Sequence, residues 1–353
     1  MRDLLENKVF RICLISVVVI IIIMLLIALF VGRGKKTITE FSLIEASKRY
    51  YEKNSNLLPK QKYETSTVNL STLIENGYVN SKVTSECPVY VTVTNLGNTY
   101  DYNAVTECFK NGTLLNKLLT NKTSSGSGLY DLNGGYIFRG ENPNNYVKLG
   151  NFKWRVIGID SNSNIKLIYS DILYATLFNE WDDRYNEDVD SQRGKNEYLT
   201  SEKSRLKEYL DNFLSMEING EYFSGKLISI LTRHNVCIGK LNINNNSNIC
   251  SKVLDNQLVS TITTNDYINA SLDPLCSLSN SINCQNYNFL NSYGWTINAN
   301  AENTYTAYYI DEYEGLKTQF ASLRSPVRPV ITIKNTVNYL SGTGTEEDPY
   351  IVR

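Results

Sequence analysis

Histidine is almost missing from this sequence, since His234 is the only one in 353 residues. Histidine-based triads and metal sites that use several imidazoles are therefore excluded. An excess of charge is missing as well, because 35 Lys and Arg face 36 Asp and Glu. A nucleic-acid-binding domain normally carries a basic patch, so we expect no nucleic-acid partner. No repeat with a period of about 20–50 residues occurs, which excludes a solenoid.

One long hydrophobic run is present at residues 12–31, and Ser16 is its one polar side chain. About 20 apolar residues are enough to cross the hydrocarbon core of a lipid bilayer. A cleavable signal peptide has a shorter apolar region of about 7–15 residues and an A-x-A-like site, which Ala28-Leu29-Phe30 does not match. The run predicts an uncleaved N-terminal transmembrane helix with the bilayer as its partner.

The cysteines indicate on which side of the membrane the chain folds. Basic residues flank the hydrophobic run equally on both sides, so the positive-inside rule does not decide the orientation. Six of the seven cysteines follow the run, and an even number without CxxC spacing is typical of disulfides in an oxidising compartment. We expect a single-pass protein of the cell membrane, with its N-terminus in the cytoplasm and its bulk extracellular. The expected pairs are Cys87 with Cys108, Cys237 with Cys250, and Cys276 with Cys284.

The first part after the hydrophobic run has the pattern of a small helix–hairpin module. Thr37 and Glu40 have the spacing of a capping box, which predicts a helix to about residue 53. A second helix should contain Leu70 and Leu73 and end at Gly77. A hairpin with a Gly97-Asn98 turn follows, and its register places Cys87 opposite Cys108.

The rest of the chain predicts four strands at 136–138, 146–149, 152–159 and 165–169, then a helix at 199–214. We therefore expect an α+β protein. Its expected parts are a cytoplasmic tail and transmembrane helix (1–36), a membrane-proximal helix–hairpin module (37–110), a Ser/Gly linker (111–128) and an extracellular α+β domain (129–353).

Two resemblances accompany this division. The module at 37–110 resembles the heads of type IV pilins and pseudopilins, which combine an apolar helix with a small disulfide-bonded sheet. The second resemblance is carried by residues 135–140, 145–147, 154–159, 201–210, 213, 264–267, 270, 276, 284, 294–296, 328–331 and 342–350. Through these residues the domain at 129–353 resembles an uncharacterised domain of exported proteins of low-GC Gram-positive bacteria, which implies a cell-surface role and no particular reaction.

A looser resemblance concerns the fold of the distal domain. Trp295, the strand at 307–310, Gly315 and the segment 328–330 resemble the closing strands of C-type-lectin-like and formylglycine-generating-enzyme-like folds. This resemblance implies a lectin-like α+β domain.

Candidate sites are few, and no catalytic residue set is present. Clustered carboxylates can bind Ca²⁺, although a solvated acidic loop has the same composition; the residues concerned are Asp182, Asp183, Glu187 and Asp188. Aromatic side chains near the C-terminus suit contact with glycans, cell-wall material or proteins, although packing on a half-buried sheet requires the same residues; these are Trp295, Tyr305, Tyr308 and Tyr309. His234 is expected in a loop beside a structural disulfide. Apart from Ca²⁺, no cofactor is expected.

These observations favour a membrane-anchored surface protein that presents a non-catalytic binding, adhesion or assembly domain. A pilin-like component of a secretion or fibre-assembly system is the first alternative, because of the helix and hairpin near the membrane. The second alternative is a cell-wall-directed enzyme that uses Asp182 or Glu187 as acid and base.

Overall fold

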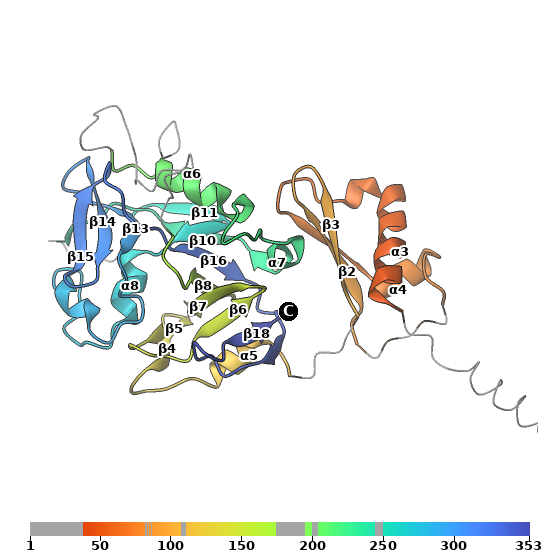
Figure 1. Cartoon of the computed structure of the whole chain (residues 1–353), viewed down its shortest axis with the longest axis horizontal. Coiled ribbons are helices and arrows are strands. Elements are labelled where there is room, and N and C mark those ends of the chain that lie inside the picture. The colour runs from red at the N-terminus through yellow and green to blue at the C-terminus, as the bar shows by residue number, and fades with distance from the viewer. Residues whose placement is uncertain are drawn as a thin grey trace, which may run out of the picture. The chain divides into compact units, whose positions relative to one another are not determined.

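The chain forms two compact units, with the boundary between Cys108 and Phe109, and each is described by itself. A computed structural model describes residues 38–106, apart from 82, 84 and 86, together with 111–173, 195–199, 204–243 and 250–353. Figure 1 shows both units, with many of their helices and strands labelled.

The helices of the first unit follow their local capping signals. Helix α3 (Glu40–Lys53) begins after Thr39, whose hydroxyl accepts a hydrogen bond from the backbone N–H of Ser42. The predicted N-cap at Thr37 is therefore two residues early, because Thr39 supplies the same capping chemistry closer to the helix. A 3₁₀ turn η1 (Ser55–Leu57) follows. Helix α4 (Leu70–Glu75) ends before Gly77, whose φ of 74° terminates it as predicted.

The first unit contains a three-stranded antiparallel sheet in the order β1 (Thr65–Asn69), β2 (Tyr90–Asn95) and β3 (Tyr100–Val105). Strands β2 and β3 pair Tyr90 with Val105 and Asn95 with Tyr100, which confirms the predicted hairpin register. Cys87 is disulfide-bonded, and its predicted partner Cys108 lies outside the described residues.

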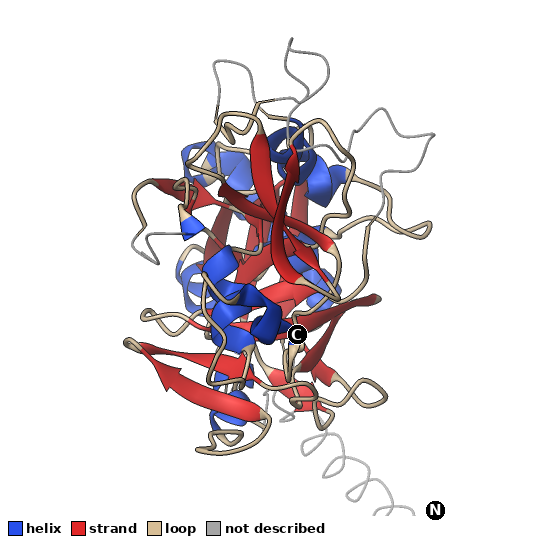
Figure 2. Cartoon of the chain, turned by 90° about the vertical axis from the view of Figure 1, so that its left-hand side faces the viewer, coloured by secondary structure: helices blue, strands red, loops and turns tan. Residues whose placement is uncertain are grey.

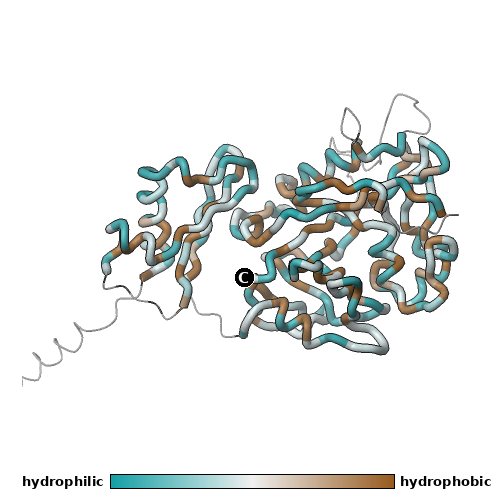
Figure 3. The backbone as a smooth tube through the Cα atoms, turned by 180° about the vertical axis from the view of Figure 1, so that it is seen from behind, coloured by the Kyte–Doolittle hydropathy of each residue, from teal (hydrophilic) through white to brown (hydrophobic). Residues whose placement is uncertain are grey.

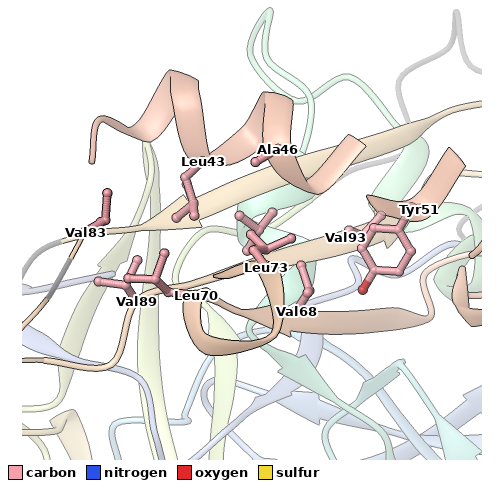
Figure 4. Packing of buried hydrophobic residues seen from close by; sticks show 11 residues of the cluster. Leu43, Ala46, Tyr51, Val68, Leu70, Leu73, Val83, Val89 and Val93 are labelled. Atoms are coloured by element: carbon pink, nitrogen blue, oxygen red, sulfur yellow. The ribbon is translucent and has the colours of Figure 1, made fainter. Parts of the chain in front are cut away.

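The core of the first unit lies between α3, α4 and one face of this sheet. Figure 4 shows Leu43 and Ala46 of α3 pointing toward the side chains from α4 and the strands, including Leu73 and Val93. Leu43, Leu73 and Val93 are fully buried. Alternation along β2 sends Val91 and Val93 to this core, so the sequence pattern and the packing agree.

The second unit begins earlier than the sequence suggests. Helix α5 (Leu114–Leu119) buries Leu114 and Leu118, and strand β4 (Gly128–Leu132) follows it. Leu114 donates its backbone N–H to the carbonyl of Val337, near the other end of the unit. The prediction of a flexible linker over 111–128 is therefore wrong: its Ser/Gly stretch is a turn between two packed elements.

A ten-stranded curled sheet organises the second unit (Figure 2). The main path runs β12-β16-β8-β7-β6-β18-β17. Off this path, β5 pairs with β7, β4 pairs with β5, and β9 pairs with β16. The pairing of β18 with β6 is parallel. The remaining strands are β5 (Gly135–Arg139), β6 (Tyr146–Leu149), β7 (Phe152–Ile159), β8 (Ile165–Tyr169), β9 (Leu231–Thr232), β12 (Val259–Thr261), β16 (Pro329–Ile333), β17 (Tyr339–Ser341) and β18 (Tyr350–Val352).

Smaller elements complete the second unit. Helix α8 (Thr264–Ala270) contacts both β5 of the large sheet and β13 (Gly294–Ala299) of a small one. The small sheet has the order β13-β14-β15. The other elements are α6 (Arg205–Asn212), η2 (Phe213–Ser215), α7 (Gly225–Ser229), β10 (His234–Cys237), β11 (Val253–Gln257), η4 (Ser281–Gln285), β14 (Thr306–Asp311) and β15 (Gly315–Phe320).

Two disulfides and an aromatic cluster hold the second unit together. Cys237–Cys250 and Cys276–Cys284 are bonded, with Cα atoms 5.6 Å and 4.6 Å apart, which confirms both predicted pairs. The ring of Trp154 packs edge-on against Tyr169 and Phe213.

Figure 3 shows hydrophobic stretches along strands of both units and hydrophilic residues at many of the turns.

The predicted α+β fold class is wrong. Strand outweighs helix, and the large sheet is curled. β-branched segments that look isolated in the sequence, such as Pro329–Ile333, find partners far away in the chain. No helix in the described ranges is long and apolar enough to cross a membrane, and residues 12–31 lie outside those ranges.

Candidate functional site

The predicted Ca²⁺ ligands cannot be compared with the structure. Asp182, Asp183, Glu187 and Asp188 belong to the segment 174–194, which lies outside the described residues. Within the described ranges, no cluster of three or more His, Cys, Asp or Glu could hold a metal ion.

The predicted aromatic ligand surface is wrong in its main members. Trp295 and Tyr308 are buried in the core of the second unit, while Tyr305 and Tyr309 are only half-buried. Trp295 of β13 packs edge-on against Tyr309 of β14. These rings serve packing within the small sheet, which is the alternative that the sequence left open. An exposed tyrosine does occur nearby, since Tyr313 lies on the turn between β14 and β15.

His234 is not a loop residue, because it belongs to strand β10 and is mostly buried. Its Nε2 atom lies 2.9 Å from the hydroxyl oxygen of Ser260. Burial lowers the pKa of His234 to about 3, and the positive charge of Lys166 adds to this effect while Asp266 opposes it. The imidazole is therefore neutral at physiological pH.

The Ser260–His234 pair lacks the remaining parts of a catalytic triad. No group in the described chain orients His234, because its buried Nδ1 atom has no hydrogen-bond partner there. Asp266 instead pairs with Lys166, at 2.7 Å. Ser260 is buried, so a substrate has no access to its hydroxyl. The pair is part of the core.

The candidate site is an open groove of about 760 Å³ in the second unit, which we call the Tyr287 groove. It lies beside 3₁₀ helix η4 and the segment that follows it, with β7 and the turn between β5 and β6 on the other side. Polar side chains dominate its lining. The lining residues are Glu141, Arg155, Asp273, Gln285, Asn286, Tyr287, Asn288, Phe289 and Asn291.

A network of backbone and amide hydrogen bonds fixes the floor of the Tyr287 groove. Phe289 donates its N–H to the carbonyl of Gly140 at 2.8 Å. The buried amide of Asn288 donates to the carbonyls of Tyr267 and Cys284. Asn291 accepts from the Tyr267 hydroxyl, also at 2.8 Å. The disulfide Cys276–Cys284 closes the loop that leads into this segment, so covalent and hydrogen bonds together hold the groove floor.

The rim of the Tyr287 groove carries polar side chains that form no hydrogen bond with other described side chains or backbone groups. Glu141, Gln285 and Tyr287 have no side-chain hydrogen bond to any described residue. The Tyr287 side chain is 62% exposed, and its backbone has a φ of 48°. A bulky residue in the left-handed region is uncommon and strained. The strain and the exposed ring occur together at the edge of a groove.

Arg155 supplies the positive charge of the Tyr287 groove. Its guanidinium carbon lies 4.4 Å and 4.6 Å from the ring centroids of Tyr146 and Phe289, in the geometry of a cation–π contact. Burial lowers the pKa of Arg155, and the nearby Tyr146 and Glu346 partly offset this effect. An arginine with this environment keeps its charge at neutral pH.

A second hollow, of about 470 Å³, lies near α8 and the turn between β4 and β5. Asp160 is its one acidic lining residue, and this carboxylate accepts hydrogen bonds from the backbone of Asn162 and Asn164 within its own turn. Asn269 also lines this hollow. Its one aromatic ring, that of Tyr136, is half-buried and lies 4.6 Å from the Nζ atom of Lys122. The Tyr287 groove, with its exposed ring, is therefore the better candidate.

No family model, curated protein or solved structure matches this chain. The site therefore has to be interpreted from its own geometry. Sequence reasoning missed the Tyr287 groove, although the run of amide and aromatic residues at 285–291 directly after Cys284 was a visible signal. The sequence around Arg155 does not predict its role, because nothing in its strand indicates that it meets Phe289, which lies 134 residues further along the chain.

Proposed function

We propose that the chain is a non-catalytic surface protein whose second unit binds a saccharide in the Tyr287 groove. The observation that carries the proposal is the combination, on a fixed floor, of an exposed aromatic ring with free polar side chains. Binding pockets of this kind place a few polar groups so that they orient the ligand.

The chemistry of the lining favours a saccharide. A sugar ring has an apolar face of C–H groups that can cover an aromatic ring, and hydroxyls that pair with carboxylates and amides. Tyr287 offers the ring, while Glu141 and Gln285 offer an acceptor and a mixed donor–acceptor. A short polar groove suits a saccharide better than it suits a protein partner, because a stable protein–protein interface usually requires a larger contact area.

The proposed location is the outer face of a cell membrane. The segment 12–31 would hold the chain to the lipid bilayer. The two disulfides support an oxidising compartment, and the resemblance of 129–353 to a domain of exported proteins supports the same location.

The test is a titration of the full-length protein in detergent with cellotetraose, chitotetraose and tetragalacturonate, followed by calorimetry. At least one saccharide should bind, and Tyr287→Ala should weaken it about tenfold or more. Tyr313→Ala is the matched control, because Tyr313 is 77% exposed and does not line the groove. Absence of binding, or equal losses in both variants, would contradict the proposal. Turnover of any saccharide would contradict the non-catalytic part.

A pilin-like assembly role is a second candidate, favoured by the first unit. There α3 covers one face of a three-stranded antiparallel sheet, and Cys87 is disulfide-bonded. Copurification of the full-length chain with a membrane ATPase complex, abolished by substitutions on the exposed face of α3 such as Phe41→Asp, would support it. Purification without such a complex would contradict it.

A further inference from the structure

Arg155 is a buried cation with unused donors at the floor of the Tyr287 groove. Its side chain is 9% exposed. Its Nε donates to the side-chain oxygen of Asn145 at 3.0 Å, and its Nη1 donates to the carbonyl of Phe289 at 3.3 Å. Both acceptors are neutral. A guanidinium has five N–H donors, so most of its donors have no acceptor in the described chain.

No carboxylate of the described chain forms an ion pair with Arg155. Glu346 is the one carboxylate of the described ranges whose negative charge raises the pKa of Arg155. Glu346 is already engaged, because it pairs with Lys153 at 3.1 Å and accepts from the Tyr146 hydroxyl at 3.3 Å. Its charge is thus largely satisfied by a lysine.

A second buried arginine adds positive charge close enough to interact with Arg155. Arg328 is buried, and its Nε donates to the carbonyl of Tyr169. The two guanidinium groups repel each other enough that Arg155 helps to lower the pKa of Arg328, after the larger effect of burial. A buried charge is costly unless an opposite charge meets it, and among the described residues no carboxylate forms an ion pair with Arg155.

The two carboxylates on the rim do not fill this role. Asp273 uses one oxygen for the N–H of Leu275 and the other for the amide of Asn286. Glu141 is exposed, so water and salt screen its charge far more than they screen the buried guanidinium. The positive charge of Arg155 therefore dominates the electrostatic potential at the floor of the groove.

We propose that the saccharide bound in the Tyr287 groove is acidic, and that its carboxylate pairs with the free N–H groups of Arg155. This inference rests on the proposed function and deepens it by naming the ligand class. A planar carboxylate matches the fork of a guanidinium, and Tyr146 and Phe289 hold the fork in a fixed plane. Tyr287 would cover the ring of the same sugar residue or of its neighbour.

The experiment compares tetragalacturonate with its methyl ester, because the ester keeps the same sugar chain and replaces each carboxylate with a neutral group. Both are titrated into the full-length protein in detergent. The acid should bind at least tenfold more tightly than the ester. Arg155→Gln should abolish this preference, Arg155→Lys should restore part of it, and Arg233→Gln should leave it unchanged because Arg233 is exposed and does not line the groove.

Each outcome separates the inference from the function on which it rests. Equal binding of acid and ester would overturn the inference and leave saccharide binding in place. A preference for the acid that survives Arg155→Gln would overturn the assignment to Arg155. Failure of the acid, the ester, cellotetraose and chitotetraose alike would overturn the proposed function itself. If Arg155→Gln does not fold, the ratio of acid to ester binding in the wild-type protein decides.

Discussion

Two residues of α3 show how burial decides the effect of a substitution. Leu43 is fully buried in the core of the first unit, whereas Phe41 is 74% exposed. Leu43→Ala leaves a cavity and should lower the free energy of unfolding by about 2–5 kcal/mol. Phe41→Ala should change it by no more than about 0.5 kcal/mol. Guanidinium unfolding of both variants measures the difference, and comparable losses would contradict the packing.

His234 gives a prediction that depends on pH. Its pKa is lowered to about 3 in the folded chain, mainly by burial, while a free histidine titrates near pH 6.5. Between these values the unfolded state binds the extra proton, so this residue's contribution to stability is present above about pH 6.5 and is lost as the pH falls toward 3.

Because His234 is the single histidine, NMR of the imidazole signals tests this directly. The C–H shifts should stay at their neutral values from pH 7.5 down to about pH 4.5. A titration midpoint near 6.5 in the folded protein would show that the imidazole is not buried beside Ser260 and Lys166.

Among the structural elements, the two disulfides of the second unit should contribute similarly to the free energy of unfolding and differently to ligand affinity. They enclose short loops, with sequence separations of 8 and 13 residues. The chain-entropy estimate for loops of this size is about 2–3 kcal/mol each. The Cys276–Cys284 loop leads into the groove floor, so the Cys276→Ser, Cys284→Ser double variant should weaken tetragalacturonate binding about tenfold or more.

The matched control is the Cys237→Ser, Cys250→Ser double variant, which should lose similar stability and keep its affinity. Calorimetric titration and thermal unfolding of both variants give the two quantities. Equal losses of affinity would mean that the Cys276–Cys284 loop does not position the binding residues.

The elements also show which parts of the fold the sequence could predict. The β2–β3 hairpin was predictable because a two-residue turn and local alternation set its register. The disulfides followed from proximity along the chain. The large sheet was not predictable, because β8 pairs with β16 more than 150 residues away and nothing local specifies such a partner.

The site was harder to predict for a related reason. Aromatic residues at period two on a strand can face either a ligand or a second layer, and Trp295 and Tyr308 face the core. Arg155 and Phe289 come together only when strand β7 meets the segment after η4. The sequence contains both residues, but only the fold shows that they share a groove.

For the whole molecule, the proposed topology predicts on which side of a membrane the second unit lies. Protease added to intact cells or protoplasts should digest residues 150–353, because we propose that these residues lie outside the cytoplasm. A cytoplasmic marker protein should survive the same treatment. Protection of the second unit until the membrane is lysed would contradict the proposed topology.

The central claim is that the Tyr287 groove binds an acidic saccharide. Hydrogen–deuterium exchange of the full-length protein in detergent, with and without tetragalacturonate, tests this claim most directly because it locates the contact without any substitution. The account predicts slower exchange in peptides that cover residues 139–142 and 284–291, and unchanged exchange around Asn269 in the second hollow. Unchanged exchange in the first two peptides, or protection confined to other segments, would contradict it.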